Sequence, residues 1–437
     1  MTSNFTLEHY QNKVYNKNYY TIPLEIGTPG AEYELQLDTS TSTTWIPSYR
    51  CKNCIGARRL FDPEDSRTSS PTDIFVKIED EDGDVEGYQT ADNFQLGSYK
   101  LKQFSFVEVT KVGDNFMDHY QGKLGLGYGN YFLKNEEFNF LEKLKKDNLI
   151  KKQIFSISTI NDKKGMLFIG DVPGKEYNSY CNITSTEDLD DVYKESWVCE
   201  MSHVGILNRE KNMYNKIKLY EELKNNKLVS FDSAYDYIAA PISEKETIEK
   251  ILKKANLLCR ESKKNNLKLS NDLRHRIREE EITIICKTTK EEIKSKNMAL
   301  SFVLQDFAYS LPLEYLFKEG NEEDEMIMLI KYIDDESAIW TFGYPFFNQF
   351  LMIFNMDDKH VGMKKLKKTV LPIVDIYGKY EVKEEQSSTF FKVFGYITLI
   401  LVILAILFFV YHAVRKNNIG DNINKFVSNE NNGGSIF

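Results

Sequence analysis

The sequence lacks the signatures of metal-dependent, serine-type and cysteine-type hydrolases. Its 6 histidines form no H-E-x-x-H motif, and no serine or cysteine stands in a G-x-S-x-G or similar frame. We therefore expect neither a metal ion nor another cofactor. An excess of basic residues is also missing. The net charge is −9 at pH 7, which argues against a nucleic-acid partner but identifies no other partner.

The N-terminus lacks the apolar core of a signal peptide, because residues 1–21 are polar. Near the other end, residues 393–414 contain no Asp, Glu, Lys or Arg, and these 22 residues at about 1.5 Å each span the ~30 Å hydrocarbon core of a bilayer. This pattern predicts one transmembrane helix at 393–414 and a short tail at 415–437. Lys392 before the span, with Arg415 and Lys416 after it, favours a cytosolic tail only slightly.

Cysteine is scarce, and its spacing allows more than one interpretation. The 6 cysteines lie near one another in the sequence as Cys51/Cys54, Cys181/Cys199 and Cys259/Cys286. These pairs suit three disulfides in an oxidising compartment, whereas a cytosolic protein would keep them as thiols. A lone C-x-x-C could also be redox-active or half of a zinc site, but no second C-x-x-C accompanies this one.

Two sequons agree with the disulfide interpretation. Asn4 and Asn182 each begin an Asn-x-Thr triplet and would be glycosylation acceptors in a secretory protein. We therefore expect a single-pass, monomeric membrane protein of the secretory pathway, a vacuolar or lysosomal membrane or the cell surface, with its main domains lumenal. The N-terminus would then be incomplete or processed. The alternative is a tail-anchored protein whose main domains are cytosolic.

Two aspartates end similar apolar stretches. Tyr33, Leu35 and Leu37 alternate with polar residues, which is typical of a strand that ends at Asp38, and a second apolar run ends at Asp232. A carboxylate at the end of a buried strand is costly unless donors or a second acid accompany it. The two aspartates are therefore candidates for a shared site.

An internal repeat relates these two stretches. Each aspartate is followed by a hydroxyl residue, Thr39 or Ser233, and by a proline nine positions later. An apolar-glycine element follows each motif, at residues 123–125 and 341–343. The pattern predicts an all-β, bilobal protein in which each lobe supplies one aspartate. We place the lobes at residues 1–188 and 189–380.

Two carboxylates held close together can share one proton, because both cannot be ionised at contact distance. The ionised member can then activate a water molecule while the protonated member donates to a carbonyl oxygen. Such a pair would hydrolyse amide bonds without a metal ion or a covalent intermediate.

The sequence resembles the pepsin-like aspartic peptidase family from Tyr19 to Leu366. The resemblance rests on the segments Tyr19–Pro29, Asp38–Ser48, Cys51/Cys54, Leu124–Tyr128, the Asp232 motif and Ile339–Asn348 with Val361–Gly362. It implies an aspartic endopeptidase with a peptide or protein substrate, and the predicted span at 393–414 would make it membrane-anchored. It also implies roles for particular residues: Asp38 and Asp232 as the catalytic pair, Thr39 and Ser233 as bracing hydroxyls, Thr41 as an outer hydroxyl, Trp45 beneath the flap, and the hairpin tip with Asp80 and Gly83 as the flap. Cys259/Cys286 is similar to a disulfide of the family's C-terminal lobe, whereas Cys181/Cys199 has no counterpart.

Several positions depart from the family pattern. Ser40 and Ala234 stand where the family has glycine, which predicts about 1–3 kcal/mol of strain or a displaced N–H group. Asp80 stands where most members have the flap tyrosine, Tyr344 where they have an aspartate, and Asp236 adds a carboxylate near the pair. These departures leave an alternative function open, that of a catalytically weak or inactive protein that binds peptides.

Overall fold

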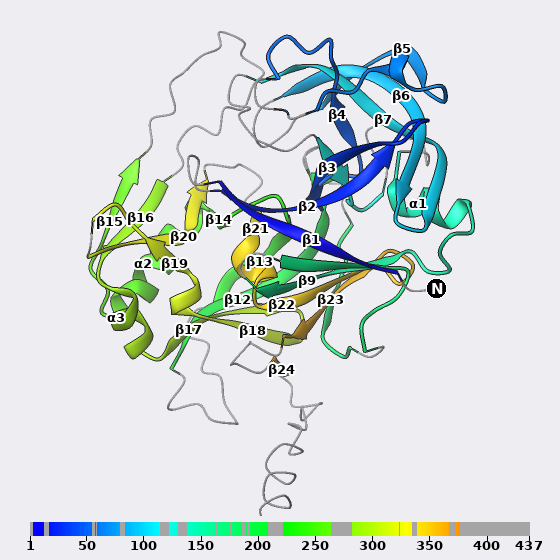
Figure 1. The fold of residues 1–437 in the computed structure, drawn as a ribbon. Coiled ribbons are helices and arrows are strands. Elements are labelled where there is room, and N and C mark those ends of the chain that lie inside the picture. Colours follow the sequence, from blue (N-terminus) through cyan, green and yellow to red (C-terminus); the bar gives the residue numbers. More distant parts are fainter. Residues whose placement is uncertain are drawn as a thin grey trace, which may run out of the picture. The chain divides into compact units, whose positions relative to one another are not determined.

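Two large β-sheets make up most of the described chain, which confirms the prediction of a mainly β protein (Figure 1). A computed structural model describes residues 3–12, 17–54, 57, 59–78, 84–113, 122–129, 138–161, 164–174, 177–185, 189, 193–208, 222–263, 282–322, 324–333, 339–366 and 373–375. The predicted flap tip, with Asp80 and Gly83, lies outside these residues, as do the predicted transmembrane span and tail. Within the described part, no helix is long and apolar enough to cross a membrane.

The first sheet has 13 strands and takes most of them from the first half of the chain. They are β1 (Ser3–Asn12), β2 (Lys17–Ile26), β3 (Ala31–Asp38), β4 (Trp45–Pro47), β5 (Ser70–Ile78), β6 (Val85–Leu96), β7 (Tyr99–Val112), β8 (Lys123–Gly125), β9 (Ile154–Asn161), β10 (Lys164–Ile169), β11 (Tyr180–Asn182), β22 (Phe350–Asn355) and β23 (His360–Lys365). Their order is β11-β23-β22-β9-β10-β1-β2-β3-β8-β4-β7-β6-β5.

The second sheet has 11 strands from the second half of the chain. They are β12 (Trp197–Asn208), β13 (Glu222–Phe231), β14 (Ile238–Pro241), β15 (Cys259–Lys263), β16 (Ile282–Lys287), β17 (Met298–Leu304), β18 (Phe307–Pro312), β19 (Phe317–Glu319), β20 (Glu325–Ile333), β21 (Trp340–Phe342) and β24 (Val374–Asp375). The order is β15-β16-β20-β14-β21-β13-β12-β17-β18-β24, and β19 pairs with β20.

The helical segments are short. The α-helices are α1 (Phe140–Lys146), α2 (Lys245–Lys254), α3 (Lys290–Ser295) and α4 (Tyr344–Phe347), and the 3-10 helices are η1 (Pro63–Asp65), η3 (Ile242–Glu244) and η4 (Leu313–Tyr315). Asn139 begins α1, where its side-chain oxygen accepts hydrogen bonds from the N–H groups of Leu141 and Glu142.

The last part of the chain returns to the first sheet. β22 pairs with β9, and β23 pairs with β22 and β11, so this sheet contains strands from both sides of the lobe boundary placed at residue 188 (Figure 1). The polar N-terminal segment also contributes, because β1 pairs with β10 and with β2. The two-lobe division itself stays a prediction.

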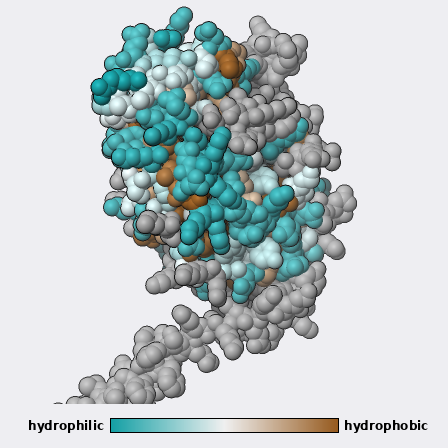
Figure 2. Space-filling view, turned by 90° about the vertical axis from the view of Figure 1, so that its right-hand side faces the viewer, coloured by the Kyte–Doolittle hydropathy of each residue, from teal (hydrophilic) through white to brown (hydrophobic). Residues whose placement is uncertain are grey.

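Aromatic packing and a disulfide join the two sheets. Trp197 of β12 is buried against Phe155 of β9 and Phe354 of β22, with ring centroids 5.9 and 5.1 Å away. Cys181 of β11 is bonded to Cys199 of β12. The face drawn in Figure 2 is mostly hydrophilic, with scattered apolar patches. The main hydrophobic core is a single cluster that contains buried residues from both sheets.

Candidate active site

The two aspartates occupy equivalent places in the two sheets. Asp38 is the last residue of β3, and Asp232 directly follows β13. β3 pairs in parallel with β8, and β13 pairs in parallel with β21, so each aspartate lies beside an apolar-glycine element. The same local arrangement is thus built twice.

Glycine is required at the end of both elements because the backbone of the neighbouring segment comes too close for a side chain. A Cβ atom on Gly125 would lie 2.4 Å from the carbonyl carbon of Ser42, and one on Gly343 would lie 2.3 Å from the carbonyl oxygen of Tyr237. These contacts explain why glycine recurs at this point of the repeat.

Reciprocal hydrogen bonds tie the two aspartate loops to each other. The hydroxyl of Thr39 donates to the carbonyl oxygen of Phe231 at 2.8 Å. The hydroxyl of Ser233 donates to the carbonyl oxygen of Leu37 at 2.7 Å. The N–H of Ser233 also donates to the Thr39 hydroxyl at 3.0 Å. Because each hydroxyl directly follows an aspartate, these bonds hold Asp38 and Asp232 on facing loops.

Each carboxylate is buried and held by its own loop. Oδ1 of Asp38 accepts hydrogen bonds from the N–H of Ser40 at 2.8 Å and from its hydroxyl at 2.5 Å. Oδ1 of Asp232 accepts from the N–H of Ala234 at 2.8 Å. Only 2% of Asp38 and 5% of Asp232 is exposed, so these donors replace hydrogen bonds that the carboxylates would otherwise make to water.

The strain predicted at the two altered glycine positions is absent. Neither Ser40 nor Ala234 is among the described residues with a positive φ angle, so a side chain costs nothing there. Both residues also keep the N–H group directed at the neighbouring carboxylate. The prediction of a strained or displaced loop was therefore wrong, and Ser40 adds a hydroxyl donor that glycine could not supply.

A buried lysine contacts the first aspartate. Nζ of Lys123 lies 3.2 Å from Oδ2 of Asp38, and the two side chains are only 1% and 3% exposed. The corresponding residue of the second half is Thr341, whose hydroxyl lies 3.0 Å from that of Ser230. The two halves therefore differ in charge at one equivalent position, and the motifs of the sequence do not mark this position as part of the site.

A second group that no sequence motif marks, Glu195, supports the Asp38 loop. The buried carboxylate of Glu195 accepts hydrogen bonds from the hydroxyl of Thr41 and the N–H of Ser42, both at 2.9 Å. The hydroxyl of Ser196 donates to the carbonyl oxygen of Ser40 at 3.0 Å. Thr41 thus bonds to Glu195, and its expected role as an outer hydroxyl of the site stays a prediction.

The additional carboxylate of Asp236 has a partner of its own. Its Oδ2 lies 4.0 Å from Nζ of Lys318, and its side chain is buried. Nearby, the rings of Tyr235 and Tyr237 pack at a centroid distance of 5.1 Å. Tyr344, the other altered residue, begins α4, and its N–H donates to the carbonyl oxygen of Tyr235.

Trp45 lies beneath the hairpin whose tip was predicted to be the flap. It is fully buried in a cluster with residues of β5, β6 and β7, including Val76, Val85 and Val107. The hairpin strands β5 and β6 are described, but Asp80 and Gly83 between them are not. The roles assigned to these two residues stay predictions.

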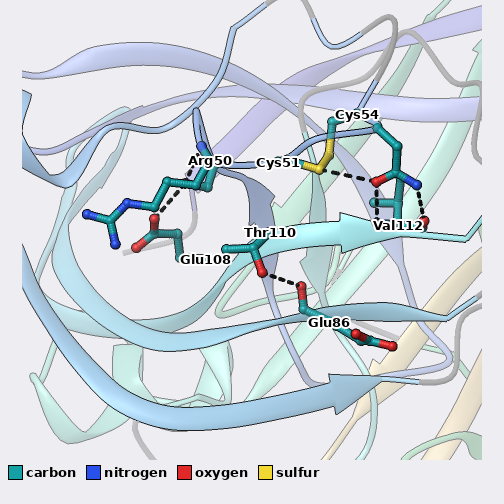
Figure 3. Close-up of a disulfide and its surroundings, with 9 residues drawn as sticks. Arg50, Cys51, Cys54, Glu86, Glu108, Thr110 and Val112 are labelled. Carbon is teal, nitrogen blue, oxygen red and sulfur yellow. Dashed lines mark hydrogen bonds between the residues drawn. A yellow bond between two sulfur atoms is a disulfide. The ribbon is translucent and has the colours of Figure 1, made fainter.

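All six cysteines form the three predicted disulfides: Cys51–Cys54, Cys181–Cys199 and Cys259–Cys286. The first closes a tight loop whose Asn53 exchanges hydrogen bonds with the backbone of Val112 at the end of β7 (Figure 3). The third joins directly paired residues of β15 and β16.

The predicted glycosylation acceptors are both exposed, Asn4 on β1 and Asn182 on β11. No group of three or more His, Cys, Asp or Glu side chains in the described part of the chain is arranged to hold a metal ion. What the site offers chemically is therefore two buried carboxylates on braced loops, with an ammonium group beside one of them.

Comparison with known proteins agrees with this arrangement. The family model for eukaryotic aspartyl protease matches residues 19–366. Mucorpepsin of Rhizomucor pusillus is 31% identical over 170 residues, which are 35% of this chain and 39% of that protein. Renin of Echis ocellatus is 21% identical over 357 residues, 78% of each chain. Pregnancy-associated glycoprotein 2 of Sus scrofa is 27% identical over 177 residues, 39% of this chain and 40% of that protein.

Proposed function

Because the chain belongs to the eukaryotic aspartyl protease family, we propose that it is an aspartic endopeptidase that uses Asp38 and Asp232 as its acid–base pair. The observation that carries this proposal is the reciprocal bonding of Thr39 and Ser233, which locks two buried carboxylates onto facing loops. Such bracing supplies the fixed geometry on which acid–base catalysis depends.

The chemistry follows from one proton shared by the two carboxylates. The ionised carboxylate takes a proton from water as the oxygen of that water bonds to the peptide carbonyl carbon, and the protonated carboxylate gives its proton to the carbonyl oxygen. When the C–N bond breaks, a proton passes to the leaving nitrogen. In each loop the aspartate would transfer the proton, and the hydroxyl residue that follows it would hold the loop in place.

We also propose that residues 393–414 anchor the protein in a membrane and that its main domains are lumenal, in the secretory pathway, a vacuole or lysosome, or at the cell surface. The apolar length of this segment supports the anchor. The three disulfides support an oxidising compartment. Exposure of Asn4 and Asn182 is compatible with glycosylation.

Cleavage of fluorogenic peptides by the full-length protein in detergent micelles tests the proposed activity. We expect turnover between roughly pH 3 and 6, the range of a carboxylate pair, with inhibition by a statine-type compound. Asp38→Asn and Asp232→Asn should abolish it, whereas the matched change Asp306→Asn at a turn away from the site should not. Turnover that survives in both site variants would contradict the proposal.

One observation favours a second candidate function, a peptide-binding protein without catalysis. The ammonium group of Lys123 contacts Oδ2 of Asp38, an oxygen that could otherwise bind the reacting water. In this case peptides would bind to the folded protein but remain intact, as mass spectrometry after long incubation would show. Asp38→Asn would then leave binding unchanged.

A further inference from the structure

Lys123 contacts Asp38 directly, although the shared-proton chemistry does not require a cation there. It is the first residue of β8, and in the parallel pairing of β8 with β3 it lies opposite Gln36. Residues in register on neighbouring strands project from the same face of a sheet, so Lys123 shares a face with Gln36 and with Asp38 two positions later. Its ammonium group reaches Oδ2 of Asp38.

The second half shows that this arrangement is not needed to build the loop. There Ser230 lies opposite Thr341 in the same register, and the two hydroxyls are 3.0 Å apart. The loop that follows still directs the N–H of Ala234 at Asp232. A neutral pair therefore satisfies the same position in the second half, so the charge of Lys123 is not needed to build such a loop.

The other charged groups around the pair have different partners. Glu195, behind the Asp38 loop, accepts from Thr41 and Ser42, and Asp236 on the second loop faces Lys318. On the strands packed against Lys123, Gln36 and Trp45 are neutral. Among the described residues of these elements, Lys123 is the cation in contact with Asp38, and Asp232 is the remaining titratable group of the pair.

We propose that Lys123 is a positioning residue that keeps Asp38 ionised, so that the shared proton resides on Asp232. This inference rests on the proposed function and deepens it by assigning the two roles. Asp38 is the base that takes a proton from water, and Asp232 is the acid that donates to the carbonyl oxygen. Because opposite charges attract, the ammonium group of Lys123 stabilises the ionised form of the neighbouring carboxylate.

The pH dependence of kcat tests the assignment in the full-length protein. Lys123→Met removes the charge at similar volume, and Lys123→Thr copies the residue of the second half. In both variants we expect both limbs of the pH profile to move to higher pH by about 1 unit or more, the size of effect an opposite charge within 4–6 Å exerts. Lys123→Arg keeps the charge and should keep the profile.

Lys143→Met is the matched control, because Lys143 of α1 is another buried lysine, and its ammonium group lies 3.3 Å from Asp147, which directly follows that helix. It should leave both limbs in place. Limbs that do not move in Lys123→Met and Lys123→Thr would overturn the proposal, as would equal shifts in Lys143→Met.

A second measurement is independent of turnover. At pH 6, Asp38→Asn leaves the ammonium of Lys123 buried beside a neutral amide, whereas Asp232→Asn mimics the protonated acid. We expect the urea midpoint to fall more in Asp38→Asn, and Lys123→Met added to Asp38→Asn to recover part of that loss. Equal losses without recovery would refute the role of Lys123. A wild-type protein that shows these stability effects but no cleavage would refute the proposed function alone.

Discussion

The hydroxyl of Thr39 is the contact whose removal tests the site most directly. It donates to the carbonyl oxygen of Phe231 and accepts from the N–H of Ser233, and it is fully buried. Thr39→Val keeps the shape of the side chain but can make neither bond. The loops that carry Asp38 and Asp232 would then keep only the hydrogen bond from Ser233 to Leu37 among the three described above.

The expected loss of stability follows from the two groups left without a partner. A buried N–H or carbonyl group that loses its hydrogen bond costs about 1–3 kcal/mol, so Thr39→Val should lower the free energy of unfolding by about 2–6 kcal/mol. Ser233→Ala breaks one hydrogen bond of its hydroxyl, to the carbonyl of Leu37, and should cost about 1–3 kcal/mol. The order of the two losses is part of the prediction.

Tryptophan fluorescence during urea unfolding measures these losses. The 3 tryptophans of the chain, Trp45, Trp197 and Trp340, are all fully buried, so unfolding of either half changes the signal. Thr72→Val is the control, because Thr72 makes a comparable bond to the carbonyl of Gln89 at an exposed position; it should stay within about 0.5 kcal/mol of wild type. Thr39→Val that is as stable and active as this control would refute the bracing role.

Three further changes have expected outcomes. Glu195→Ala leaves the hydroxyl of Thr41 and the N–H of Ser42 without their acceptor and should lower both kcat and the urea midpoint. Replacing Cys181 and Cys199 with Ser opens a loop with a sequence separation of 18 and should cost about 2–4 kcal/mol in unfolding experiments. Burial lowers the pKa of His360, so the unfolded chain takes up its proton first as the pH falls below about 6.5; the urea midpoint should drop between pH 7.5 and 5.5, and His360→Gln should reduce that drop.

The aspartate loops could be predicted from the sequence because their signals are local. An alternating strand, an aspartate and a hydroxyl residue stand side by side, and the repetition of this pattern points to two facing loops. The disulfide pairs were likewise near one another in the sequence. The prediction of strain at Ser40 and Ala234 failed because it assumed a positive φ angle that neither residue adopts.

The groups that the sequence did not reveal depend on long-range pairing. Lys123 reaches Asp38 only because β8 pairs in parallel with β3. Glu195 bonds to Thr41 across a sequence separation of 154 residues. The pairing of β22 with β9 is also a long-range contact that no local sequence pattern indicates. An alignment of residues 123–125 with 341–343 does contain one usable signal, the lysine that replaces an uncharged residue in an otherwise buried element.

That lysine also separates the two candidate functions. A buried ion pair contributes little net stability compared with a well-packed neutral pair, and the Ser230–Thr341 contact shows that this fold accepts a neutral pair at the same position. Lys123 therefore matters for the charge of Asp38 more than for the fold. If the wild-type protein binds peptides without cleaving them, Lys123→Thr is the substitution we expect to release Asp38, and cleavage gained in that variant but not in Lys123→Arg would identify the ammonium group as the cause. If neither variant cleaves peptides while both still bind them, the missing activity arises elsewhere in the site.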